Sequence, residues 1–238
     1  DDRVPLVVPE VNPGALKKHQ GFIANPNCST IQMVVALYPL HIEFGLKRVI
    51  VSTYQAVSGT GKKAVEELQK QVESYVKGEK IINEVYPYQI FGNVIPEIGS
   101  LSDEFEGYYT EEVKMIKETR KIMDLPDLHV SATCVRVPVF NGHSESITAQ
   151  FEKNPDVNKA RKILEKFPGI KVIDLPEKSL YPVPLSVSGK DEVYIGRLRK
   201  NPAFDNALDM WVVSDNIRKG AALNAVQIAE KMIEMSLL

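Results

Sequence analysis

The chain has two thiols, Cys28 and Cys134, and Cys28 stands where a thiol could act as a nucleophile. It follows the segment 25–27 (Asn-Pro-Asn) and precedes an apolar run that is typical of a buried helix. A helix N-terminus lowers the pKa of a thiol, because its free N–H groups and its dipole stabilise the thiolate. Cys28 is therefore a candidate nucleophile. The alternatives are a small buried side chain or a residue that helps to cap the helix.

A second group of candidates lies in the segment 135–144. Arg136 falls within an extended run, where a buried guanidinium is costly unless it faces an anion such as a carboxylate or phosphate. His143 follows the turn at 141–142 and could exchange a proton near neutral pH. A salt-bridged arginine and an exposed turn histidine are the alternative. A cysteine, a base and an anion-binding arginine in one chain together favour a catalytic site.

The segment 58–63 (Ser-Gly-Thr-Gly-Lys-Lys) resembles a phosphate-binding loop but lacks its first glycine, because Ala56 occupies that position. The helix after it could still receive a phosphate or carboxamide through its N–H groups, or the glycines could serve only the turn. Gln55 ends the preceding strand. Glu111 and Lys114 are three residues apart and can share a helix face, which is usually solvated surface.

Periodicity predicts the elements that would position these side chains. We expect strands at 4–9, 22–24, 46–57, 129–140, 145–151, 192–199 and 207–213, and helices at 30–38, 62–76, 110–123, 154–166 and 215–235. Pro39 should end or kink the first helix, residues 83–99 should be irregular, and Asn141-Gly142 should join two strands in a hairpin. The expected fold class is α+β, with a mixed, partly antiparallel sheet and helices on one face.

Composition excludes several classes of function. The formal net charge is −2, with 44% hydrophobic and 25% charged residues, so nothing favours a nucleic-acid or membrane partner. Two cysteines form no disulfide framework, and the four histidines show no metal-ligand spacing, so we expect no metal. Residues 1–5 do not resemble a signal peptide, and a reducing, cytoplasmic setting is expected. No G-x-G-x-x-G dinucleotide fingerprint occurs.

Several segments, in the same order, resemble the aspartate-semialdehyde dehydrogenase family from Val4 onward. They are Pro9 to Asn12, Asn25 to Thr30, Ser52 to Gly61, Arg136 to Ser144, and Ser214 to Ala222. The resemblance implies a sheet domain similar to the C-terminal domain of glyceraldehyde-3-phosphate dehydrogenase. It also implies NADPH-dependent reduction of aspartyl phosphate to aspartate semialdehyde and phosphate, in lysine (diaminopimelate), threonine and methionine biosynthesis.

The resemblance also implies a role for each catalytic candidate. Cys28 matches the nucleophile that forms an acyl-enzyme, and Asn27 matches an active-site asparagine beside it. Gln55 matches the glutamine that orients the thiohemiacetal, and His143 matches the acid/base. A thiolate that adds to a carbonyl needs such a proton carrier nearby.

Three further candidates match substrate-binding residues of the family. Arg136 matches the residue that binds the substrate carboxylate, Glu111 the residue that contacts the amino group, and Lys114 a lysine near the phosphate. Binding these remote charges would hold the carbonyl against the sulfur.

Ser58, Gly59 and Asn216 match positions near the nicotinamide half of NADP. The resemblance further implies three parts: residues 1–22 as the remnant of a dinucleotide-binding domain, 23–213 as the catalytic and dimerisation domain, and 214–238 as a helix that packs on the dinucleotide-binding domain. Because the Rossmann segment is missing, we expect a truncated enzyme with poor or absent cofactor binding and turnover.

The family implies a homodimer or a higher homo-oligomer. Two alternatives to the dehydrogenase remain open. One is a non-catalytic dimerisation module, and the other is a related acyl-phosphate reductase, such as an N-acetyl-glutamyl-phosphate reductase.

Overall fold

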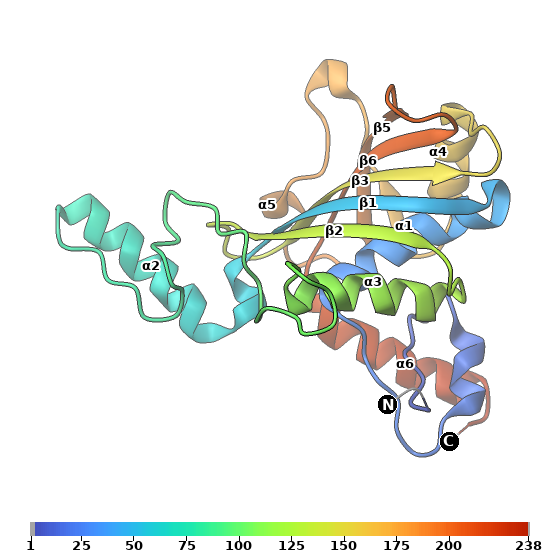
Figure 1. Ribbon diagram of the computed structural model, residues 1–238, viewed down its shortest axis with the longest axis horizontal. Coiled ribbons are helices and arrows are strands. Elements are labelled where there is room, and N and C mark those ends of the chain that lie inside the picture. Colours follow the sequence, from blue (N-terminus) through green and yellow to red (C-terminus); the bar gives the residue numbers. More distant parts are fainter. Residues whose placement is uncertain (1–2, 238) are drawn as a thin grey trace.

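A six-stranded mixed sheet forms the centre of the structure, a computed structural model that describes residues 3–237 (Figure 1). The strand order is β2-β1-β3-β6-β5-β4. β2 pairs parallel with β1 and β4 parallel with β5, whereas the other three pairings are antiparallel. The strands are β1 (Leu46–Gln55), β2 (His129–Arg136), β3 (His143–Phe151), β4 (Ile170–Val172), β5 (Val193–Lys200) and β6 (Ala207–Ser214).

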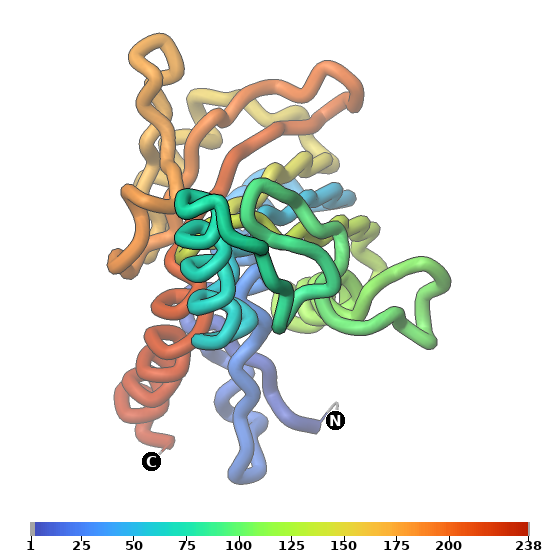
Figure 2. Tube along the Cα trace, turned by 90° about the vertical axis from the view of Figure 1, so that its left-hand side faces the viewer, coloured from blue at the N-terminus to red at the C-terminus, as the bar shows by residue number. Residues whose placement is uncertain are grey.

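Three helices cover one face of this sheet, as the sequence predicts. They are α1 (Cys28–Phe44), α3 (Thr110–Met123) and α4 (Val157–Lys166). α1 crosses β1, β3, β5 and β6, α3 lies along β2, and α4 lies against β4 and β5. A further long helix, α2 (Lys62–Lys77), projects away from the sheet (Figures 1 and 2).

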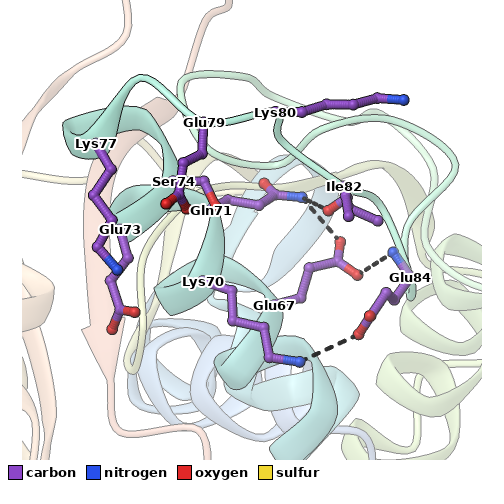
Figure 3. A pocket seen from close by; sticks show the side chains of 10 residues that line it. All are labelled: Glu67, Lys70, Gln71, Glu73, Ser74, Lys77, Glu79, Lys80, Ile82 and Glu84. Atoms are coloured by element: carbon purple, nitrogen blue, oxygen red, sulfur yellow. Dashed lines mark hydrogen bonds and ion pairs between the residues drawn. The ribbon is translucent and has the colours of Figure 1, made fainter.

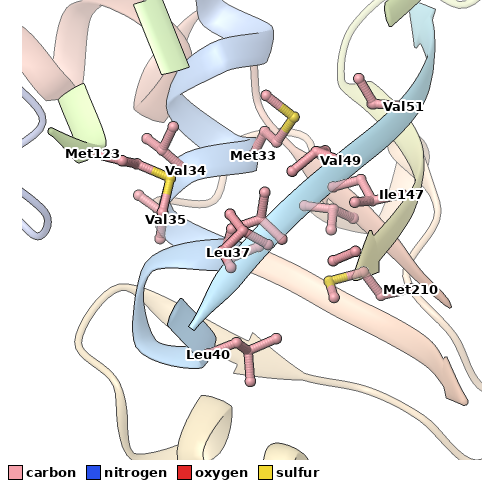
Figure 4. Close-up of a cluster of buried hydrophobic side chains, with 14 of the residues drawn as sticks. Met33, Val34, Val35, Leu37, Leu40, Val49, Val51, Met123, Ile147 and Met210 are labelled. Carbon is pink, nitrogen blue, oxygen red and sulfur yellow. The ribbon is translucent and has the colours of Figure 1, made fainter. Parts of the chain in front are cut away.

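The main core lies between α1 and the sheet. Alternate residues of a strand point to the same face, so Val49 and Val51 of β1 meet Ile147 of β3 and the apolar side of α1 (Figure 4). Met33 and Leu37 of α1 are fully buried in this cluster. This packing fixes where the first residue of α1 lies relative to the strand ends.

α1 differs from its predicted extent at both ends. It begins at Cys28 rather than Thr30, because the Asn27 side chain accepts the N–H groups of Ser29 and Thr30. It continues through Pro39 to Phe44. Pro39 removes one backbone hydrogen bond, but burial against the sheet stabilises the helix beyond it.

The predicted hairpin between the strands around Asn141-Gly142 is wrong. β2 and β3 are not neighbours, because β1 inserts between them and pairs with both. Residues 137–142 form a connection across the end of β1. A two-residue turn signal carries no information about a third strand from elsewhere in the chain, so local sequence could not reveal this insertion.

The two predicted N-terminal strands are also absent. Residues 4–9 and 22–24 contribute only one isolated bridge, between Leu6 and Ala24. The intervening segment contains the 3-10 helix η1 (Pro13–Lys18). An extended apolar run becomes a strand only where a partner strand lies beside it, and the described residues supply a single bridge.

The C-terminal helix is confirmed, with an irregular start. A π-helix, η4 (Arg218–Ala222), leads into α6 (Leu223–Glu234). Ile228 and Met232 of α6 pack on Val7 and Leu16 in a small cluster of their own. The predicted division at residues 22 and 213 stays a prediction, and Asp1, Asp2 and Leu238 lie outside the described residues.

Two side chains of α2 hold the irregular segment 82–91 (Figure 3). Glu67 accepts the N–H groups of Glu84 and Val85. Gln71 donates to the carbonyl of Ile82 and accepts the N–H groups of Ile90 and Phe91. A cavity of ≈ 260 Å³ lies beside them, among charged side chains of α2 and the loop. The segment then forms a bridge from Ile95 to Arg136, at the end of β2.

The opposite face of the sheet is only partly covered. The sequence did not predict three elements that lie between α4 and β5 in the chain. They are the edge strand β4, the 3-10 helix η3 (Pro176–Lys178) and the short helix α5 (Pro184–Val187). Val187 packs on Tyr194 and Val213 and covers the β5–β6 part of this face. Ile50 and Tyr54 of β1 stay exposed on the rest.

Candidate active site

Three strands end side by side and bring Arg136, Gln55 and His143 together. Gln55 at the end of β1 pairs with Arg136 of β2. On the other side of β1, Tyr54 pairs with Ser144 of the antiparallel strand β3, so Gln55 comes next to His143. All three side chains are at most 5% exposed and lie on the sheet face that α1 and α3 cover. The register of β1 therefore joins two segments that the sequence separates by more than eighty positions.

Cys28 is the first residue of α1, at the same end of the sheet. It remains partly exposed. η4 lies directly against it, because a Cβ placed on Gly220 would come within 2.9 Å of the Cys28 Cβ. Only a glycine allows the π-turn to approach Cys28 this closely.

Asn27 is held at three points. Its side-chain carbonyl caps α1, and its side-chain amide donates to Glu111 Oε1 at 2.8 Å. Its backbone N–H donates to Glu118 Oε2 at 2.7 Å. Gln55 Nε2 donates to the same Glu111 oxygen at 3.1 Å, so one carboxylate of α3 links the cysteine turn to the end of β1.

The backbone of Ala56 connects Arg136 and His143. Arg136 Nη1 donates to the Ala56 carbonyl at 2.7 Å, and the Ala56 N–H donates to His143 Nδ1 at 3.1 Å. Because a backbone N–H can only donate, Nδ1 is the acceptor nitrogen, and the neutral ring carries its proton on Nε2. The Nε2 atom is buried without a protein partner, beside Gly59. His143 is therefore arranged as a proton donor.

Burial and neighbouring charges shift the pKa values of Cys28 and His143. Burial and, to a smaller extent, the Glu111 carboxylate raise the pKa of Cys28 to about 12, whereas the Ser29 N–H and Arg136 lower it. Burial also lowers the pKa of His143 well below its usual value, with Arg136 contributing. Desolvation outweighs the helix N-terminus in the unliganded chain, so the pKa of Cys28 moves in the direction opposite to the one expected for an anion-prone thiol, and the reactivity of Cys28 stays a prediction.

The three predicted cofactor-binding residues lie together beside His143. They are Ser58, Gly59 and Asn216. The Asn216 side-chain carbonyl accepts the N–H of Gly142 at 2.9 Å, and its amide donates to Ser58 Oγ at 3.0 Å. Gly59 lies so close to Arg136 and His143 that an added Cβ would be 3.0–3.1 Å from their side-chain atoms. The three predicted cofactor positions are therefore contiguous with the predicted catalytic ones.

Lys114 borders this cluster from the surface. Its Nζ is 4.0 Å from Glu111 Oε2, and its side chain is 57% exposed. The shared helix face expected from the spacing is confirmed. All ten predicted site residues thus lie at one end of the sheet or on the helices above it.

Sequence reasoning missed Glu118, Glu145 and Gly220. Glu118 is seven residues after Glu111, a spacing that places both on one face of α3 and could have revealed it. Glu145 shares the strand face of His143, is fully buried with neither oxygen bonded, and has a pKa raised well above its usual value by burial. Nothing local marks Gly220.

Two other classes of site are absent from residues 3–237. No group of histidine, cysteine, aspartate and glutamate side chains there could hold a metal ion. No helix of that part of the chain is long and apolar enough to cross a membrane.

Comparison with known proteins decides the family. Residues 37–219 match the model of the semialdehyde dehydrogenase dimerisation domain. The chain is 53% identical over its whole length to an aspartate-semialdehyde dehydrogenase of Aquifex aeolicus and 49% identical to that of Bacillus subtilis, and it spans 70% of each. The chain belongs to the aspartate-semialdehyde dehydrogenase family.

Solved structures of the family agree with the fold. Aspartate semialdehyde dehydrogenase II of Vibrio cholerae, in complex with ASA, superposes with a TM-score of 0.94 at 42% identity, over 98% of this chain and 69% of that one. The Candida albicans aspartate semialdehyde dehydrogenase with NADP gives 0.73 at 27% identity, over 99% of this chain and 68% of that one. The mixed sheet and its helical layer are therefore those of aspartate-semialdehyde dehydrogenases.

Proposed function

We propose that this chain carries the acyl-transfer site of an NADPH-dependent aspartate-semialdehyde dehydrogenase, which converts aspartyl phosphate to aspartate semialdehyde. The observation that carries the proposal is one hydrogen-bonded network. It joins the cysteine turn to Glu111 and Gln55 and, through the Ala56 backbone, to Arg136 and His143. Family membership supports the same reaction.

In the proposed reaction, the Cys28 thiol gives up its proton, which leaves with the phosphate. The sulfur attacks the acyl-phosphate carbon, the carbon–oxygen bond to phosphate breaks, and a thioester forms. NADPH, when bound, supplies the hydride that reduces this thioester. The His143 Nε2–H would donate to the substrate oxygen, and the Gln55 amide would orient the thiohemiacetal. Collapse of the thiohemiacetal releases the aldehyde and returns the sulfur as thiolate.

Substrate recognition is assigned to three charged residues. Arg136 has an unpartnered Nε and would bind the substrate carboxylate. Glu111 would bind the ammonium group. Lys114, exposed on the same helix, would contact the phosphate.

The nicotinamide half of NADP is assigned to Ser58, Gly59 and Asn216. Gly59 supports this assignment, because any side chain there would fill the space beside Arg136 and His143. The Asn216 amide fixes Ser58 and the backbone of Gly142 around this space. These residues would orient the nicotinamide ring over the sulfur.

A homodimer formed through the uncovered face of the sheet completes the proposal. The family model describes a dimerisation domain, and Ile50 and Tyr54 expose apolar surface on that face. The ring centroids of Tyr54 and Trp211 are 5.4 Å apart in a tilted contact, so the apolar patch continues from β1 to β6. Two unpaired cysteines accord with the proposed cytoplasmic location.

The acylation half of the reaction tests the proposal on this chain, since it needs no cofactor. Aspartyl phosphate should release phosphate and add one aspartyl group to Cys28, detected by peptide mass. Cys28→Ser should abolish both signals, and Cys134→Ser should keep them, because Cys134 is buried. A non-catalytic dimerisation module would give no acylation. A glutamyl-phosphate reductase would prefer the longer, N-acetylated substrate.

A further inference from the structure

The backbone of the residue before Cys28 is bonded to α3, which packs against α1. The Asn27 N–H donates to Glu118 Oε2 at 2.7 Å, across 91 positions of sequence. A hydrogen bond of this length to a carboxylate is stronger than one between neutral groups. Because the peptide of Asn27 leads directly into Cys28, this bond limits where the sulfur can lie.

Two glutamates of α3 divide the donors of Asn27 between them. Glu111 and Glu118 are seven residues apart, so they project from the same face of the helix. Glu111 Oε1 accepts the side-chain amide of Asn27 at 2.8 Å, and Glu118 accepts its backbone N–H. The Asn27 side-chain carbonyl in turn caps α1. α3 therefore fixes both the residue that precedes Cys28 and the start of the helix that begins there.

The two carboxylates differ in what the substrate would do to them. In the proposed function Glu111 binds the substrate ammonium group, and its Oε1 already accepts from Gln55 at 3.1 Å as well as from Asn27. The ammonium group would compete with these amides for the carboxylate oxygens. Glu118 has no assigned contact with the substrate, so its bond to the Asn27 backbone persists when the substrate binds.

We propose that Glu118 is a positioning residue for acylation, which holds the Cys28 sulfur in line with the acyl carbon through its bond to the Asn27 N–H. The inference rests on the proposed function, in which Arg136 and Glu111 hold the substrate on β2 and α3. The sulfur belongs to a different element, so the turn before α1 must be fixed relative to α3. A displacement of about 1 Å between reacting groups can cost about a hundredfold in rate.

The charge of Glu118 offers an alternative role. The N-terminus of a helix favours a nearby anion, so a carboxylate beside the start of α1 could stabilise that helix without placing the sulfur. The two roles have different requirements. Positioning requires an acceptor oxygen at the correct reach, whereas the interaction with the helix dipole requires a negative charge.

Glu118→Gln and Glu118→Asp separate these requirements. Glutamine keeps the reach and an acceptor oxygen without the charge, so it should keep the acylation rate close to that of the unmodified chain. Aspartate keeps the charge but is one methylene shorter, so it should lower the maximal acylation rate about ten- to hundredfold. The half-saturating concentration of aspartyl phosphate should stay the same in both variants, because Glu118 does not hold the substrate.

Glu112→Asp is the matched control. Glu112 lies on the same helix, and its carboxylate also accepts a backbone N–H from another element, that of Cys134 on β2 at 2.9 Å. The same shortening there should lower stability but leave the acylation rate unchanged, because Cys134 lies outside the turn that carries Cys28. Thermal unfolding of every variant shows how much stability each one has lost.

Alkylation of Cys28 by iodoacetamide gives a readout that does not depend on an oriented substrate. This reaction needs only an accessible thiol that can ionise. Glu118→Asp should therefore alkylate at least as fast as the unmodified chain while it acylates more slowly. Equal proportional losses in the two reactions would mean that the variant changes the reactivity of the thiol rather than its position, and would overturn the inference.

The acylation rates also separate this inference from the proposed function. A folded Glu118→Asp chain that acylates at the unmodified rate overturns the inference and leaves the proposed function intact. Slow acylation by Glu118→Gln with a normal rate for Glu118→Asp assigns the charge instead, and equal losses for Glu118→Asp and Glu112→Asp assign general destabilisation. Either result contradicts positioning. Absence of acylation in the unmodified chain removes the proposed function, and the inference with it.

Discussion

Two opposing influences act on the Cys28 thiol at the scale of single residues. The N–H of Ser29, at the start of α1, stabilises a thiolate, whereas burial and the Glu111 carboxylate oppose it and raise the thiol pKa. Burial is the larger influence on this pKa, so the helix N-terminus alone does not lower it. The same end of the molecule also buries Glu145 without a hydrogen-bond partner, and burial holds its pKa well above the usual value.

Gly220→Ala tests how closely η4 must approach Cys28. The new Cβ would lie 2.9 Å from the Cys28 Cβ, so the π-turn or the cysteine must shift. We expect slower acylation of Cys28 and a loss of about 1–3 kcal/mol in the free energy of unfolding. Urea denaturation and the acylation assay measure the two effects.

Gly14→Ala is the control for this substitution. No heavy atom lies within 4 Å of the position that a Cβ on Gly14 would take, so neither stability nor acylation should fall. Equal behaviour of the two alanine variants would show that the close contact at Gly220 has no effect on the site.

At the scale of elements, one buried ion pair ties the two ends of the chain together. Lys219 of η4 donates to both oxygens of Glu10, and also to Asn224 and Gln227. The Lys219 side chain is 1% exposed and that of Glu10 is 9% exposed. Burial lowers the pKa of Lys219, and Glu10 acts against that shift. This contact positions η4, and through it Gly220, against the cysteine.

Lys219→Met should therefore destabilise the fold strongly. It leaves the Glu10 carboxylate buried without its cation, which costs about 3–5 kcal/mol in comparable buried pairs. Urea denaturation gives the loss directly. Lys231→Met removes an exposed partner of Glu234 and should cost at most about 1 kcal/mol. Similar losses for the two variants would mean that the buried pair has no special role.

At the scale of the whole molecule, the sheet has one helix-covered face and one that is partly bare. An antiparallel or mixed sheet with exposed apolar residues on one face buries them most readily against a second copy. The candidate active site and this bare face are different parts of the same strands. Loss of the proposed dimer should therefore leave the candidate active site assembled.

Ile50→Glu should weaken the proposed dimer at least about tenfold, because it places a charge within the apolar face of β1. Sedimentation velocity across a concentration series measures the change. Ile42→Glu is the control, since Ile42 is 64% exposed on α1, which lies on the opposite side of the sheet. A dimer that tolerates Ile50→Glu but not Ile42→Glu would place the interface elsewhere.

Much of this architecture is already decided locally. The bounds of α3 agree with the sequence expectation at both ends, because its apolar spacing, acidic first turn and basic last turn all indicate one helix. The helix that begins at Cys28 and the strand that ends at Gln55 were predicted in type and place but not in all their bounds. Family resemblance then identified the chemistry.

Only the tertiary structure decided how these segments meet. The insertion of β1 between β2 and β3 brings Gln55 beside Arg136 and His143, and no local pattern encodes that pairing. Burial at this junction also raises the pKa of Cys28 and lowers that of His143, because desolvation depends on what surrounds a group rather than on its neighbours in sequence. The sequence determined which residues could react, and the fold determined which of them meet and how far each is removed from water.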